Sequence, residues 1–161
     1  MTVSSTPESP EQPEPYAEPR SGGRMIWHLL SLLTGLVLTP IAIALMTYGG
    51  ARWLRAAQNM TGERDLPGLA ALLAGAFLLV LVASLGARSA VGPLLAGVVW
   101  GVFPALVYVA GPLDATGWVL DVPGLPAEIE NGTVTWLAVG CFLAVGATLL
   151  GAGFSGALRR S

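Results

Sequence analysis

The chain has 161 residues, of which 53% are hydrophobic and only 11% are charged, and its mean hydropathy is +0.67. Because soluble domains carry about 25% charged residues, this composition excludes a water-soluble globular fold and predicts an all-α integral membrane protein in a lipid bilayer. The formal net charge of -2 is too small to indicate nucleic acid or another polyanion as a partner.

Residues 1–24 are rich in proline and glutamate and contain almost no apolar side chains. A segment of this kind buries too little surface to offset the entropy that it would lose on ordering. We therefore predict a disordered, acidic, cytoplasmic tail. Its serines and threonines leave a docking or phosphorylation role open, beside the simpler interpretation of a solvated leader.

The first apolar run covers residues 25–48. A helix of about 20 residues matches the roughly 30 Å hydrocarbon core of a bilayer, and the run exceeds the apolar region of about 7–15 residues in a secretory signal peptide. The sequence therefore predicts a retained membrane-spanning helix, which Pro40 should kink near mid-membrane. Three small residues four positions apart can face a neighbouring helix: Ser31, Gly35 and Thr39.

The first connection, residues 49–65, begins with the Gly49-Gly50 pair, which we expect to end the first helix before a short interfacial extension. Aromatic rings and snorkelling guanidinium groups suit the headgroup layer at the ends of membrane helices. For His28, which we also predict to be an interfacial anchor, a pH-sensing role is the less favoured alternative. The predicted interfacial anchors are Trp27, His28, Arg52, Trp53 and Arg55.

The second apolar run, residues 66–85, contains no charged side chain. Asp65 precedes it as a candidate helix cap, and Pro67 stands in the first turn, where a missing N–H is tolerated. Only residues 86–89 separate this run from the next. Such a short turn predicts that the second and third spans lie antiparallel and adjacent.

The third span, residues 90–111, is uncharged and carries small residues every fourth position, at Gly97, Gly101 and Ala105. Lipid gives two helices no hydrophobic reason to associate, so close backbone approach through small residues becomes a main source of attraction. The pattern therefore predicts that this helix occupies the centre of the bundle.

Residues 112–132 hold three prolines, four carboxylates and no arginine. We expect an acidic loop that folds back on the mouth of the bundle or lies in the membrane interface. Its carboxylate spacing does not fit a calcium-binding EF-hand loop, so no metal site is predicted. Asn131-Gly132-Thr133 forms a glycosylation sequon, which matters only in a secretory pathway that reads it.

The fourth span is predicted at residues 133–154 and contains a second stripe of small residues with helical spacing. We expect this smooth face to pack against the third span. Cys141, the only cysteine, is interpreted as a small buried hydrophobe. The members of the stripe are Gly140, Ala144, Ala147 and Gly151.

The distribution of arginines near the ends of the spans predicts the topology. If the amino terminus is inside, five arginines are cytoplasmic and three, Arg52, Arg55 and Arg64, are outside. The excess favours both termini in the cytoplasm. The five are Arg20, Arg24, Arg88, Arg159 and Arg160.

The predicted spans contain no ionisable residue of the kind that proton-coupled carriers, pumps and voltage sensors place at membrane depth. A single interfacial histidine cannot supply a catalytic triad. We therefore predict no catalytic residues, no cofactor and no metal. The acidic Pro-rich leader, the Ala/Gly/Leu/Val helices and arginine as the only base resemble small uncharacterised four-span membrane proteins of actinobacteria. That resemblance implies a plasma-membrane location and transfers no functional residue.

The sequence thus predicts a bundle of four transmembrane helices that is not an enzyme. Its expected role is an accessory subunit that associates with itself or with a larger membrane complex. The alternative is a small oligomeric transporter or channel, and an enzyme acting on lipid ranks third, which clustering of His28 with loop carboxylates would favour. Candidate residues for a polar or kinked transport pathway are Thr34, Thr39, Pro40, Pro93 and Pro104.

Overall fold

The computed structural model describes residues 22–59, 64–87 and 89–158, with side chains from residue 29 onward. The predicted tail therefore lies outside the described residues, except that residues 22–24 already belong to the first helix. Helices are the only regular secondary structure of the described part, and four helical segments are long and apolar enough to cross a membrane. The elements are α1 (Gly22–Gln58), α2 (Leu66–Leu85), α3 (Val91–Gly97), η1 (Val98–Val102), α4 (Phe103–Ala110), α5 (Pro112–Leu120), α6 (Ala127–Ala138) and α7 (Cys141–Leu158).

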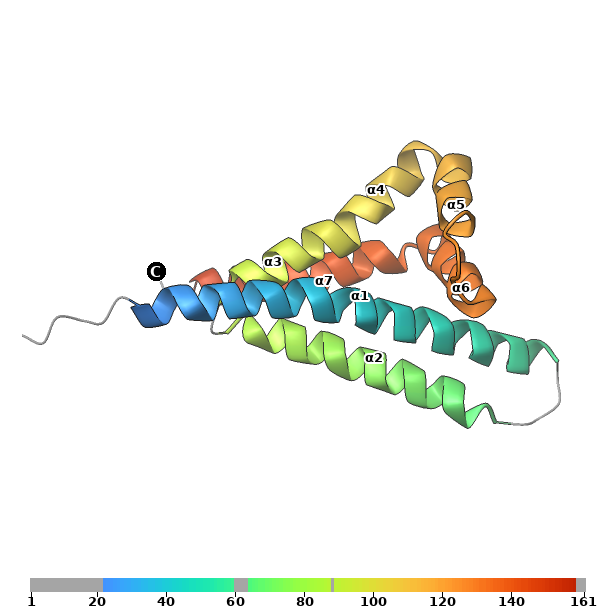
Figure 1. Ribbon diagram of the computed structural model, residues 1–161, viewed down its shortest axis with the longest axis horizontal. Coiled ribbons are helices and arrows are strands. Elements are labelled where there is room, and N and C mark those ends of the chain that lie inside the picture. The colour runs from blue at the N-terminus through green and yellow to red at the C-terminus, as the bar shows by residue number, and fades with distance from the viewer. Residues whose placement is uncertain (1–21, 60–63, 88, 159–161) are drawn as a thin grey trace, which may run out of the picture.

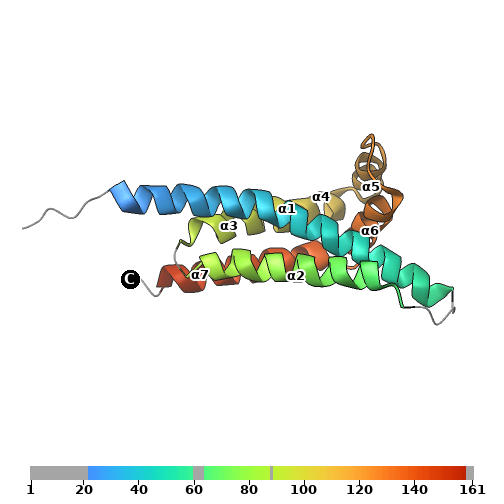
Figure 2. The same cartoon turned by 60° about the horizontal axis from the view of Figure 1, so that its bottom comes forward.

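The protein is an all-α bundle of four membrane-spanning helices (Figure 1 and Figure 2). The crossings are α1, α2, the continuous run α3–η1–α4, and α7. α1 begins and α7 ends at one end of the bundle, whereas α5 and α6 are folded across the other (Figure 1). The two described ends of the chain therefore lie at the same end of the bundle.

The first helix continues through the Gly49-Gly50 pair, so the prediction that these glycines end it is wrong. A Cβ on Gly49 would collide with the backbone of Gly68 and Leu72 in α2. The glycine thus serves close packing of two helices, and this tertiary contact overrides its weak helix propensity. At 37 residues and 1.5 Å per residue, α1 is about 55 Å long and extends beyond the hydrocarbon core.

α1 is one of two helices at the centre of the bundle. It packs against α2 along most of its length and also contacts α3 and α6. Glycines lie where these helices pack together. Gly35 of α1 contacts the backbone of Gly92 in α3, Gly75 of α2 contacts Ala42 of α1, and Gly132 of α6 contacts Thr47 of α1. The prediction that residues 90–111 occupy the centre is confirmed in part, because the third crossing packs on α1 and α7 and touches α2, while α1 shares the centre as the main neighbour of α2 and α6.

The second helix has the predicted bounds, Leu66–Leu85. Asp65 caps it by accepting a hydrogen bond from the N–H of Gly68 at 3.4 Å, and Pro67 stands in the first turn. However, α2 packs mainly along α1 and has only a limited contact with α3. The short turn after α2 reverses the chain as expected, but α1 rather than α3 is the main neighbour of α2.

The third crossing contains a π-helical turn, η1, between α3 and α4. Pro104, the second residue of α4, stands two positions after the end of η1, and a proline has no N–H to donate to the preceding turn. In α1, Pro40 likewise leaves the carbonyl of Leu36 without its usual helical donor. The indole Nε1–H of Trp100 in η1 donates a 3.0 Å hydrogen bond to that carbonyl. The side chain of one irregular helix therefore satisfies the backbone of the other.

The third and fourth crossings pack together as predicted, through Gly97 and Gly101. A Cβ on either glycine would meet the backbone of Gly146 in α7. Ala105 is buried beside Phe142 of α7 and Ile43 of α1. These three small residues of the third crossing therefore face the interior.

The face that α7 uses is not the predicted one. Its buried residues are Phe142, Gly146, Leu149, Gly153 and Gly156. Of the predicted stripe, Ala144, Ala147 and Gly151 are exposed, and a Cβ on Gly151 would meet no atom within 4 Å. Gly140 lies before α7 at a positive φ of 78°. The stripe therefore points away from the bundle, because the opposite glycine face of the same helix makes the contact.

Residues 112–132, predicted to be a loop, form α5 and the first half of α6 instead. Two of the three prolines mark helix starts, since Pro112 opens α5 and Pro126 precedes α6, and proline is favoured at the first turn. The predicted continuous span 133–154 is likewise interrupted at Val139 and Gly140. The left-handed backbone of Gly140 breaks the helix there, so the fourth crossing is Cys141–Leu158.

Candidate functional site

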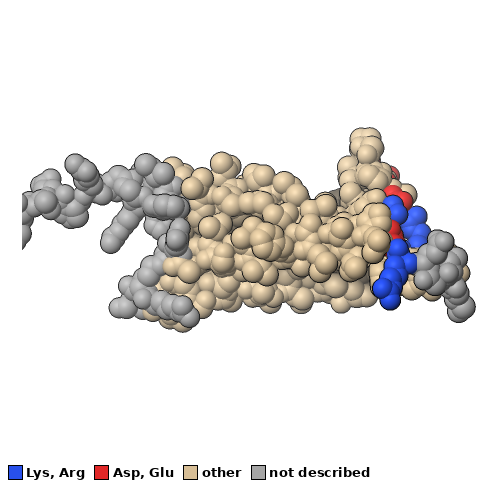
Figure 3. Space-filling view, turned by 90° about the horizontal axis from the view of Figure 1, so that it is seen from below, with Lys and Arg blue, Asp and Glu red and all other residues tan. Residues whose placement is uncertain are grey.

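The charged side chains of the described residues gather at one end of the bundle, where α1 ends, α2 begins and α6 starts (Figure 3). The helices between this end and the opposite one present an uncharged surface in the same view. The charged end contains three arginines together with five carboxylates from the start of α2, from α5 and the residue that follows it, and from α6. Its members are Arg52, Arg55, Arg64, Asp65, Asp114, Asp121, Glu128 and Glu130.

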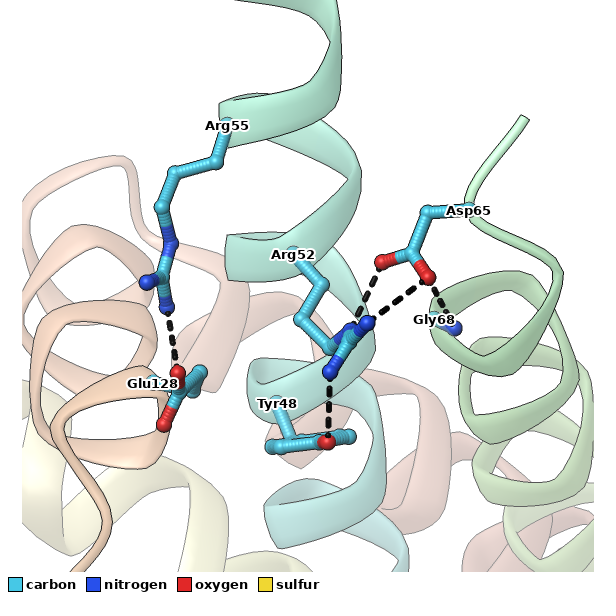
Figure 4. Close-up of polar contacts among 6 residues, drawn as sticks. All are labelled: Tyr48, Arg52, Arg55, Asp65, Gly68 and Glu128. Atoms are coloured by element: carbon cyan, nitrogen blue, oxygen red, sulfur yellow. Dashed lines mark hydrogen bonds and ion pairs between the residues drawn. The ribbon is translucent and has the colours of Figure 1, made fainter. Parts of the chain in front are cut away.

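Arg52 and Asp65 form a two-pronged ion pair between α1 and the start of α2 (Figure 4). Arg52 Nε donates to Asp65 Oδ2 at 2.7 Å, and its Nη2 donates to Oδ1 at 3.0 Å. Its Nη1 also donates to the hydroxyl of Tyr48 at 3.1 Å. The hydrogen bonds from Arg52 hold the pKa of Asp65 below its ordinary value. Because Asp65 also caps α2, this pair joins the end of one helix to the start of the next.

Arg55 and Glu128 form a second bridge, from α1 to α6 (Figure 4). Arg55 Nη2 lies 3.0 Å from Glu128 Oε1. Hydrogen bonds from its own backbone N–H and from Arg55 lower the pKa of Glu128. Both side chains are partly exposed, so solvent screens the pair and its main effect is to hold α6 in position.

The two pairs line a polar pocket of about 220 Å³. Each cation in it already faces a carboxylate, so the four charges compensate one another. Among the described residues, no three His, Cys, Asp or Glu side chains come close enough to hold a metal ion together. The arrangement therefore ties three helix ends together and supplies no activated nucleophile or free base.

A second, mainly apolar groove of about 430 Å³ lies between the last turns of α1 and α6. Trp136 packs edge-on against Phe142, with ring centroids 6.2 Å apart, and its Nε1 is 3.7 Å from the position of a Cβ on Gly50. Trp53 is 43% exposed. The lining residues are Gly50, Ala51, Trp53, Leu54, Ala57, Gly132, Thr135 and Trp136.

The predicted interfacial anchors differ in their positions and contacts. Arg52 and Arg55 lie near the end of α1 as expected, but both are engaged in ion pairs within the chain. Trp53 lies beside them and lines the apolar groove. Trp27 and His28 belong to the helical backbone of α1, and their side chains lie outside the described residues.

Sequence reasoning missed both ion pairs and the groove. Arg52 and Asp65 are only 13 positions apart, and both lie within the predicted connection of residues 49–65, so their opposite charges were an available signal. Glu128, the partner of Arg55, lies within residues 112–132, for which the sequence predicts a loop. Comparison of the chain with protein-family models, curated proteins and solved structures found no match.

Proposed function

We propose that this chain is a non-catalytic component of the plasma membrane that works by associating with other membrane helices through the outward face of α7. The partner is a second copy of the chain or a subunit of a larger membrane complex. The observation that carries the proposal is the exposed position of Ala144, Ala147 and Gly151, which stand on one side of α7 while glycines on its other side pack inside the bundle.

The interior of the single bundle supports a structural role. Gly35 meets the backbone of Gly92, and Gly101 meets the backbone of Gly146, so neighbouring helices touch through their main chains. Such contacts leave no space for a transported species between α1 and α3 at Gly35, or between η1 and α7 at Gly101. A transport pathway, the second candidate function, would therefore have to form between chains rather than within one.

The outward face of α7 has the chemistry that favours helix association in lipid. Small residues allow two backbones to approach closely, and van der Waals packing then replaces the missing hydrophobic drive. Thr148 lies on the same exposed side, and its hydroxyl donates to the Ala144 carbonyl at 2.8 Å. The hydroxyl group is therefore satisfied within its own helix, and the face presents a smooth surface to a partner.

Substitution by leucine separates folding from association. Gly151→Leu adds a side chain where a Cβ meets nothing within 4 Å, so it should preserve the fold and abolish association. Gly101→Leu should disrupt the fold itself, because its Cβ would meet the backbone of Gly146. Ala74→Leu, at an exposed position of α2, is the matched control for a larger side chain on a lipid-facing helix.

The measurement is energy transfer between differently labelled chains in lipid vesicles, with circular dichroism as the folding check. Wild type and Ala74→Leu should show the same transfer, and Gly151→Leu should show only the transfer of randomly distributed monomers. Association that survives Gly151→Leu unchanged would refute the proposed interface. Ion flux in the same vesicles distinguishes the second candidate: flux that appears with wild type and disappears with Gly151→Leu would assign an oligomeric pathway instead.

A further inference from the structure

The apolar groove between α1 and α6 has the size and the setting of a ligand site. Its volume of about 430 Å³ falls within the roughly 300–1,000 Å³ typical of small-molecule pockets. Gly50, Ala51 and Ala57 of α1 line it with small residues, while Trp53 and Trp136 supply aromatic surface. Because the groove lies on the last turns of α1, a helix long and apolar enough to cross a membrane, we expect it to face the interfacial part of the bilayer.

Neighbouring charges indicate the depth of the groove in the bilayer. The Arg55–Glu128 ion pair bridges the same two helices. Arg55 adjoins Leu54 of the groove, and Glu128 is about one helical turn before Gly132. Charged side chains favour the headgroup layer over the hydrocarbon core. The groove therefore lies at the depth of the glycerol backbone and the first methylene groups of a phospholipid.

The hydrogen-bonding groups of the groove favour a ligand that carries a hydrogen-bond acceptor. The hydroxyl of Thr135 already donates to the Asn131 carbonyl at 2.7 Å. By contrast, the indole Nε1–H of Trp136 has no acceptor among the described residues. Tryptophan is a donor only, and this N–H is not among the buried unpaired groups of the described residues, so an acceptor from outside the chain can reach it. An occupant that brings a carbonyl oxygen and an apolar chain, with no donor of its own, complements this groove.

We propose that the groove binds a glycerophospholipid from the surrounding bilayer. One acyl chain lies against Gly50, Leu54 and Trp53, and the ester carbonyl of that chain accepts a hydrogen bond from Trp136 Nε1. This site is lined by residues of α1 and α6 and by none of α7, and it does not depend on the association proposed above.

The test measures retained lipid by native mass spectrometry of the full chain, extracted in mild detergent and supplied with dioleoylphosphatidylcholine. Wild type should retain one phospholipid per chain. Gly50→Leu keeps ordinary contact at its Cβ, 3.7 Å from Trp136 Nε1, and extends into the groove, so retention should be lost. The matched control is Gly117→Leu, at a position where a Cβ meets nothing within 4 Å, and its retention should equal that of wild type.

A second comparison isolates the hydrogen bond. Trp136→Phe keeps an aromatic ring beside Phe142 but removes the N–H, so retention should fall about fivefold. The dialkyl ether analogue of the same lipid replaces the ester carbonyl by a weaker acceptor. Wild type should prefer the ester over the ether, and Trp136→Phe should bind both equally.

Two results would overturn the proposal. One is unchanged retention in Gly50→Leu with its near-ultraviolet circular dichroism intact. The other is a wild-type chain that binds ester and ether lipids equally well. If Gly50→Leu does not fold, the ester-to-ether preference of wild type and Trp136→Phe decides the question alone.

Discussion

At the scale of single residues, the bundle contains one cross-helix hydrogen bond with a definite structural cause. Pro40 has no N–H, so the carbonyl of Leu36 would be unpaired in a membrane interior, where water cannot compensate. Trp100 Nε1 supplies the missing donor at 3.0 Å. The same α1 turn also contains Thr39, which is fully buried and whose hydroxyl oxygen has no hydrogen-bond partner among the described residues.

We predict that Trp100→Phe destabilises the bundle by about 1–3 kcal/mol, since it leaves the Leu36 carbonyl unpaired. In a Pro40→Ala background, residue 40 regains an N–H that can donate to this carbonyl, so the same change should cost clearly less. The measurement is a double-mutant cycle on the free energy of unfolding in mixed micelles. Equal costs in both backgrounds would show that Trp100 contributes through packing and not through the hydrogen bond.

At the scale of elements, the junction between α6 and α7 depends on the backbone of one glycine. Gly140 has a φ of 78°, and its N–H donates to the Leu137 carbonyl at 3.3 Å. Residues with a Cβ pay about 1–2 kcal/mol in this left-handed region. Phe142 and Leu137 on either side of the junction are both buried in one core cluster, so the bend must keep its angle for both to pack.

Gly140→Ala should therefore destabilise the protein by about 1–2 kcal/mol, or straighten the junction. Spin labels at Asn131 and Thr148, both exposed, report the angle: a straightened junction lengthens the distance between them. Gly117→Ala serves as the control because this helical glycine has no close neighbour and gains helix propensity. Loss of stability in the control but not in Gly140→Ala would contradict the role of the positive φ.

The link between α1 and α2 should show a defined dependence on pH. The pKa of Asp65 in the folded chain is lower than its ordinary value of 3.8. A lowered pKa means that the ionised form stabilises the fold above pH 3.8 and that this contribution is lost as the pH falls toward the folded value. Glu128, with its ordinary value of 4.5 also lowered, follows the same sign.

We therefore expect acidification below about pH 4 to weaken the fold at the charged end, and Asp65→Asn to remove part of this dependence. Unfolding midpoints in micelles from pH 7 to pH 3 test this expectation. Asp121→Asn is the comparison variant, because Asp121 is exposed and makes no ion pair among the described residues. An acid response that is identical in Asp65→Asn and in wild type would exclude the Arg52–Asp65 pair as its source.

At the scale of the whole molecule, the sequence predicts which segments span the membrane better than it predicts which face of each helix packs inside the bundle. The bounds of α2 are predictable because a cap, a first-turn proline and an uncharged apolar run agree. On α7, by contrast, two stripes of small residues have helical spacing, one containing Ala144 and Gly151 and the other Gly146 and Gly153. Local pattern cannot choose between them, because the choice depends on where Gly97 and Gly101 approach.

The ion pairing at the charged end could not be predicted from the sequence for a related reason. Prolines in residues 112–132 suggest a loop when they are taken as helix breakers, although the same residues favour the first turn of a helix. Once α6 forms from Ala127, Glu128 stands opposite Arg55, 73 positions away by subtraction of the residue numbers. A contact of that sequence separation follows from the packing of α6 on α1 at Gly132, which nothing in the local pattern specifies.

The arrangement of the crossings also bears on how the protein lies in its membrane. The start of α1 and the end of α7 share one end of the bundle (Figure 1). By position in the sequence, five arginines flank this end and three flank the other. At the second end, Arg52 and Arg55 are engaged by carboxylates of the chain itself. Since arginines near the ends of spans favour the cytoplasm, we predict that both termini are cytoplasmic.

Accessibility labelling in intact cells tests this orientation. In a Cys141→Ala background, a cysteine at Asp121, an exposed position between α5 and α6, should react with a membrane-impermeant maleimide. A cysteine at Ser5 should react only after the cells are permeabilised, because the predicted tail is then inside. Labelling of Ser5→Cys but not Asp121→Cys in intact cells would reverse the topology. Equal labelling of both would indicate a mixed population, as expected if the difference of two arginines is too small to fix the orientation.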